Sequence, residues 1–193
     1  ALAQHGRTQA LERDRAFQWF SERGGYPIVH ERYQEPWGML ADQLNENVIR
    51  RVIQHDLRIG DRGRKRDAAL LEEVFRMSCR YIGQSPTTLE FARQAQQTLN
   101  ANVGSERIRH YLRFLGETLL LRLVPPLEIR LTKKKGNAKI CLADHGLRAS
   151  WLQDIIPIDS PGLRANPHLA DLAGHIAESV VGNTLSTISG LDL

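Results

Sequence analysis

Basic side chains lie close together in the segment SERIRHYLRFLGE, residues 105–117. The apolar residues of this segment recur at helical spacing, which predicts a helix with a buried face formed by Ile108, Tyr111, Leu112 and Leu115. The side chains that fall away from this face are Arg107, Arg109, His110 and Arg113. Arginine matches phosphates and guanine edges with its forked donors. The pattern favours contact with nucleic acid, and the alternative is an ordinary solvated face.

Two other basic clusters accompany this helix. The segment RIGDRGRKR, residues 58–66, is predicted to be a loop and ends in Arg64, Lys65 and Arg66. A predicted hairpin tip, KKKGN, contains Lys133, Lys134 and Lys135, which suit backbone phosphates. Residues 58–66 and 105–139 carry net charges of +4 and +6, whereas the whole chain carries +4, so the rest of the chain sums to −6. Such a distribution is typical of a surface that faces a polyanion.

The elements that must position these residues read as three helices followed by strands. Asp67 is predicted to cap the first of these helices. Thr87 and Glu90 have the spacing of a capping box at the start of the second, from which Leu89, Ala92 and Leu99 are expected to face inward. Ser105 is predicted to cap the third. Strands are expected at residues 118–124, 127–131 and 138–143. Three helices followed by a β-hairpin have the order of a winged helix.

Further helices are expected before and after this unit, at residues 8–23, 36–57, 147–155 and 167–189. The first is predicted to bury Leu11, Ala16, Trp19 and Phe20, and the second Leu40, Leu44, Val48, Val52 and Ile53. The fold class is therefore mostly α with a small β-hairpin or sheet (α+β). We expect an N-terminal helical segment at 1–66, a winged-helix domain at 67–142 and, at 143–193, the truncated start of an α/β domain.

The sequence contains none of the motifs that indicate a self-contained enzyme. It has no G-x-x-x-x-G-K-[ST] loop, no dinucleotide fingerprint and no G-x-S-x-G turn. Its seven histidines lack metal-ligand spacing and are expected to be surface or capping residues, so no metal site is predicted. Cys79 and Cys141 lie in apolar-rich segments, which suits reduced, buried thiols. Without an apolar run near ~20 residues or a signal peptide, the chain is expected to be cytoplasmic, with no membrane contact.

Several stretches resemble the C-terminal region of a family of prokaryotic AAA-type ATPases. GGYP at 24–27 resembles the element that follows the ATPase lid, and NENVIRRVIQHDL at 45–57 the helix after it. Residues 67–131 resemble the family's winged helix. KICLADHGLRASWL at 139–152 resembles its strand-Asp-x-Gly-Leu element. HIAESVVGNTL at 175–185 resembles the helix that opens a PD-(D/E)XK nuclease-like domain of unknown function.

This resemblance implies a larger parent protein. The nucleotide-binding core would precede Ala1, and ATP and Mg are expected only for that missing core, with no cofactor in this chain. Of the family's metal-binding carboxylates, only Glu178 has a matching position, and Ala177 stands where the family has a bulky residue. The nuclease-like site is therefore incomplete, so the fragment itself is not expected to be an enzyme, whereas the parent is expected to be an ATPase with a nuclease-like domain.

The preferred hypothesis is a non-catalytic accessory fragment of an AAA-type ATPase that binds DNA or a protein partner through its winged helix. One alternative is a free-standing winged-helix transcriptional regulator that dimerises on its operator. Another is a connector for protein–protein interaction. The expected partners are accordingly duplex DNA, another protein, or a second copy of the chain.

Overall fold

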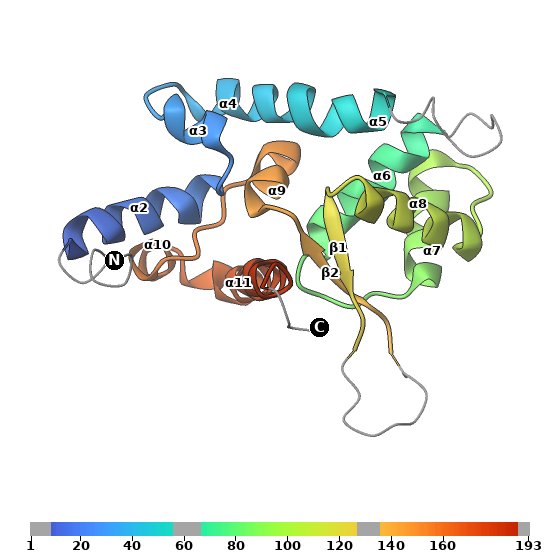
Figure 1. Cartoon of the computed structure of the whole chain (residues 1–193). Coiled ribbons are helices and arrows are strands. Elements are labelled where there is room, and N and C mark those ends of the chain that lie inside the picture. The colour runs from blue at the N-terminus through green and yellow to red at the C-terminus, as the bar shows by residue number, and fades with distance from the viewer. Residues whose placement is uncertain (1–8, 56–66, 127–135, 189–193) are drawn as a thin grey trace.

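The computed structural model describes residues 9–55, 67–126 and 136–188 (Figure 1). Over these residues the chain is mostly helical with one small antiparallel sheet, which confirms the predicted fold class. Three residues that belong to the three predicted segments, Ile53, Leu71 and Ile176, all lie in one cluster of buried apolar side chains. The segments expected as separate domains therefore share a hydrophobic core.

The N-terminal helix α2 (Ala10–Arg23) projects from the body of the molecule (Figure 1). Its residues 10–19 are exposed, and Leu11 retains 87% of its accessible surface. The prediction that Leu11, Ala16 and Trp19 face a core is wrong, because all three side chains are exposed; Phe20 alone of that set is half-buried. A short helix not predicted from the sequence, α3 (Pro27–Glu31), follows the glycine pair.

The next helix is continuous but changes its winding. It consists of α4 (Trp37–Leu44), a π-helical stretch (Asn45–Arg50) and α5 (Arg51–His55), and Pro36 lies just before its first residue. A π-turn spaces hydrogen-bonded residues by five positions and shifts the buried stripe by one residue. Of the predicted buried residues, Leu40, Leu44 and Ile53 are fully buried. Val48 and Val52 are only half-buried, and Ile49, which was not predicted, is fully buried instead.

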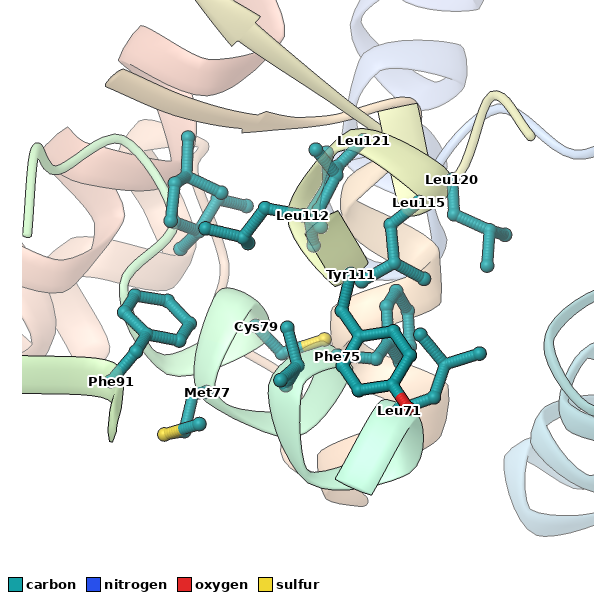
Figure 2. Packing of buried hydrophobic residues seen from close by; sticks show 14 of the residues in the cluster. Leu71, Phe75, Met77, Cys79, Phe91, Tyr111, Leu112, Leu115, Leu120 and Leu121 are labelled. Atoms are coloured by element: carbon teal, nitrogen blue, oxygen red, sulfur yellow. The ribbon is translucent and has the colours of Figure 1, made fainter. Parts of the chain in front are cut away.

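Three helices form the predicted helical unit: α6 (Ala68–Arg80), α7 (Thr88–Leu99) and α8 (Ser105–Glu117). Asp67 caps α6 and Thr87 caps α7, both through side-chain oxygens that accept backbone N–H groups, as predicted. Ser105 does not cap α8; it is the first helical residue, after Gly104. Figure 2 shows side chains of these helices meeting in the core. Leu89, expected inside, is exposed.

The sheet pairs β1 (Leu121–Val124) with β2 (Lys139–Leu142), with Leu121 opposite Leu142. The strand predicted from Thr118 starts later, because α8 ends at Glu117 and Leu119 adopts a left-handed conformation. On its other edge β2 bonds to residues 83–84: Gly83 N–H donates to the Ile140 carbonyl at 2.8 Å, and Ile140 N–H to that of Gln84 at 2.9 Å. The predicted strand at 127–131 lies outside the described residues.

The C-terminal part comprises α9 (His145–Leu152), α10 (Ser160–Ala165), a 3₁₀ turn (Pro167–Leu169) and α11 (Ala170–Leu185). The helix α10 lies between two predicted helices, where no helix was predicted, and its N-cap is Asp159. The helix α11 packs against the end of β2: Ser179 Oγ accepts from Leu142 N–H at 3.0 Å, and Asn183 donates to the Ala143 carbonyl at 2.8 Å. The small sheet therefore contacts α11 as well as the three helices.

We predict that Leu119→Gly stabilises the protein. Leu119 has a φ of 60° and leaves 72% of its surface exposed, so glycine would relieve a left-handed backbone without loss of packing. The expected gain in the free energy of unfolding is roughly 1 kcal/mol, measured by urea denaturation. Leu119→Ala is the control, since it removes the same exposed side chain but keeps the strained backbone. An equal gain in both variants would contradict the explanation.

Candidate nucleic-acid interface

The helix α8 separates its side chains as the sequence predicts. Ile108, Tyr111 and Leu115 are buried against the three-helix core, and Leu112 lies with them. All four residues proposed to contact nucleic acid lie on the exposed face: Arg107, Arg109, His110 and Arg113. Because the buried face fixes the helix, these side chains project from a rigid support.

Weak surface contacts hold two of the arginines on this face. Arg107 Nη2 lies 3.4 Å from Asp67 Oδ2, and its guanidinium lies over the Tyr111 ring at 5.8 Å from the centroid. Arg109 forms an ion pair with Glu106, one turn earlier. Exposed pairs of this kind contribute at most about 1 kcal/mol and are screened by salt. The arginines can therefore exchange these carboxylates for phosphates of a ligand.

The start of α6 lies against α8. The Asp67 N–H donates to Tyr111 Oη at 2.9 Å, while the Asp67 carboxylate faces Arg107. In the sequence, Asp67 directly follows the basic segment 58–66. Six predicted site residues, however, lie outside the described residues: Arg64, Lys65, Arg66, Lys133, Lys134 and Lys135.

Glu178 lies on the exposed side of α11 and forms an ion pair with Lys139 of β2. The hydrogen bond from Lys139 lowers the pKa of the Glu178 carboxyl, with a smaller contribution from His175. Within residues 9–55, 67–126 and 136–188, no group of three or more His, Cys, Asp or Glu side chains could hold a metal ion. In this geometry Glu178 ties α11 to the sheet.

A buried polar cluster joins the end of α2 to the start of α9. Asp144 Oδ2 accepts the Gly25 N–H at 2.7 Å, and Oδ1 accepts the Gly146 N–H at 2.7 Å. His145, which we expected at the surface or as a cap, is 4% exposed and donates through Nε2 to the Ser21 carbonyl at 3.2 Å. Burial raises the pKa of Asp144 and lowers that of His145.

The sequence contained the two halves of this cluster without showing that they meet. The GGYP and Asp-x-Gly-Leu elements belong to the resemblance described above, but 119 positions separate Gly25 from Asp144. The signal that could have pointed to a close approach is the set of adjacent small residues, Gly24, Gly25 and Gly146, because glycine is used where backbones come close together.

Cys79 and Cys141 are both free and buried, as predicted, and burial raises the pKa of each thiol. In the part of the chain that the structure describes, no helix is both long and apolar enough to span a bilayer.

Comparison with known proteins gave one result. A family model described as "Domain of unknown function (DUF8612)" matches residues 15–156. No curated protein and no solved structure matches the chain. Since that description assigns no activity, the resemblance to AAA-type ATPases and to nuclease-like domains stays a prediction.

We predict that Glu178→Gln has a small and pH-dependent effect. Because the pair with Lys139 lowers the pKa of Glu178 in the folded protein, its stabilisation is present above the ordinary glutamate pKa and is lost as the pH falls through the lowered value. At neutral pH the variant should lose less than about 1 kcal/mol of unfolding free energy, and nothing in strong acid. Urea denaturation across pH measures this, with Glu12→Gln on α2 as the control; a pH-independent loss would contradict it.

Proposed function

The chain belongs to the DUF8612 family, a domain of unknown function, and we propose that it binds duplex DNA through the exposed face of α8. The observation that supports this proposal is that α8 has one buried apolar face and one exposed basic face. The apolar face is buried in the core, and the exposed face bears three arginines and a histidine, Arg107, Arg109, Arg113 and His110. The helix is the third of a three-helix unit and leads directly into the antiparallel strands. This is the order in which winged helices present a recognition helix.

The dimensions of α8 fit this role. It has 13 residues, which at 1.5 Å per residue gives a length of about 20 Å. An α-helix enters the major groove of B-DNA, which is about 12 Å wide. Arg109 and Arg113 are four positions apart and lie one turn from each other on the same side. In a groove, both guanidiniums of such a pair can lie on phosphates.

The larger context proposed for this activity is an accessory role in an AAA-type ATPase. What supports it is the resemblance of GGYP, the winged helix and the Asp-x-Gly-Leu element to that family. ATP and Mg would then be bound by a nucleotide-binding core outside this sequence. The binding of DNA to α8 would be transmitted to that ATPase core.

A second candidate function is that of a protein-binding connector. One observation favours it: Phe17, Trp19 and Tyr33 are exposed, and the rings of Trp19 and Tyr33 stack at 5.1 Å between centroids. Exposed aromatic side chains are enriched at protein interfaces. This surface belongs to α2 and the turn after α3, and it does not involve α8, so the two functions are compatible.

We predict that the protein binds a fluorescein-labelled duplex of about 20 base pairs, with strong salt dependence. Each phosphate contact releases counterions, so three contacts from α8 should weaken binding by roughly 40-fold between 50 and 200 mM salt. Fluorescence anisotropy at several salt concentrations measures this. The absence of binding at 50 mM salt, or an affinity that salt does not change, would exclude the proposal.

We predict that Arg109→Ala combined with Arg113→Ala weakens DNA binding by roughly tenfold or more and reduces the salt slope by about two. Arg107 is left intact because it contacts Asp67 and Tyr111. The matched control is Arg13→Ala with Arg15→Ala, which removes the same charge from α2, at the opposite end of the molecule in Figure 1. Equal losses of DNA affinity in both double variants would mean that only the net charge of the protein matters, and would contradict a specific role of α8.

A further inference from the structure

Asp67 faces the basic side of α8 with a carboxylate that the fold holds in place. Its backbone N–H donates to Tyr111 Oη at 2.9 Å, and its Oδ1 accepts the Leu70 N–H at 3.2 Å as the N-cap of α6. Tyr111 is 2% exposed and Leu70 is fully buried, so both partners belong to the rigid part of the three-helix unit. The other carboxylate oxygen, Oδ2, lies 3.4 Å from Arg107 Nη2.

Arg107 is supported from two sides. Its guanidinium lies over the Tyr111 ring at a distance that permits a cation–π contact, and the Asp67 carboxylate neutralises its charge. The side chains of Arg107 and Asp67 keep 46% and 43% of their surface exposed, so a phosphate can approach the guanidinium from solvent. Because the ring contact does not require the carboxylate, Arg107 can exchange one anion for another while it stays on the ring.

The two acidic residues that pair with arginines of α8 are held differently. Glu106 lies on α8 itself, and its side chain is 85% exposed, so it can turn away into solvent when Arg109 takes another partner. The side chain of Asp67 is short and already bonded through Oδ1 to the start of α6. Its Oδ2 therefore stays next to the place that a phosphate on Arg107 would take, and like charges at such a distance repel each other.

We propose that the Asp67 carboxylate occupies the position of a DNA phosphate beside Arg107 and acts as an autoinhibitory contact that weakens DNA binding by α8. In the free protein Arg107 is already paired, and a phosphate gains this arginine only by displacing the carboxylate. The contact weakens binding to all duplexes alike, since phosphate contacts carry no sequence information. This inference rests on the proposed function and describes its regulation.

Asp67→Asn tests the contact, because it removes the charge beside Arg107 and little else. Asparagine is as good an N-cap as aspartate, so the Leu70 N–H keeps an acceptor, and the backbone bond to Tyr111 is unaffected. The variant should bind a fluorescein-labelled duplex of about 20 base pairs roughly two- to fivefold more tightly than the parent protein at about 50 mM salt. The gain should shrink as the salt concentration rises, because exposed ion pairs are screened.

A double-mutant cycle shows whether the gain depends on Arg107. In the background of Arg107→Ala, Asp67→Asn should increase the affinity much less, because the carboxylate then has no guanidinium to occupy. An equal increase in both backgrounds would overturn the proposal, since the carboxylate would then act on the DNA only through its charge.

The matched control is Asp42→Asn, which removes the same charge from an exposed position of α4, apart from α8 in Figure 1. It measures the effect of net charge alone, and a gain equal to that of Asp67→Asn would also overturn the proposal. Circular dichroism confirms that each variant is folded. Asp67→Ser, a second neutral N-cap, replaces Asp67→Asn in the comparison should the latter fail to fold.

The same titrations separate this proposal from the one on which it rests. If parent and Asp67→Asn bind the duplex equally well, DNA binding by α8 stands and only the autoinhibitory contact is excluded. If neither the parent nor any variant binds at about 50 mM salt, both proposals are excluded.

Discussion

The arrangement of this chain depends on a half-buried carboxylate, that of Asp144, which accepts backbone N–H groups from two segments that lie far apart in the sequence. Hydrogen bonds to a charged group contribute about 1.5–3 kcal/mol each, but burial of the charge costs part of that sum. The raised pKa of Asp144 reflects that cost. The main effect of the contact is geometric, since it fixes where the N-terminal helices leave the body. The cluster extends to His145, whose Nδ1 is buried without a hydrogen-bond partner among the described residues, as suits a neutral ring with a lowered pKa.

A different kind of constraint supports the DNA-binding proposal. The three-helix unit is held by apolar side chains that are almost fully removed from water, including Leu71, Phe75 and Leu115 (Figure 2). At about 25 cal/mol per Å² of buried apolar surface, such a core outweighs the exposed ion pairs on α8. The basic side chains can therefore change partners without moving the helix that carries them.

The sequence predicted what is encoded locally. The caps at Asp67 and Thr87 and the buried face of α8 follow from spacing within one or two turns, and the structure confirms them. Spacing could not reveal the π-helical stretch at 45–50. Because of it, Ile49 is fully buried in place of the predicted Val48. Nor could spacing show that Leu11 is exposed, or that Gly25 meets Asp144, because both depend on how distant segments assemble. At the candidate interface, exposure of the four α8 residues was predictable, but the Asp67–Arg107 contact that joins two helices was not.

The position of β2 has a consequence for assembly. Strands at the edge of a sheet offer unpaired N–H and C=O groups to other chains, which is how edge-to-edge association and strand addition begin. In this sheet β2 bonds to β1 along one side, and Ile140 bonds to residues 83–84 on the other. On the side of β2 away from β1, both backbone groups of Ile140 are thus already bonded within the chain. A binding partner could not extend the sheet by pairing with β2 at Ile140 unless it first displaced the segment between α6 and α7.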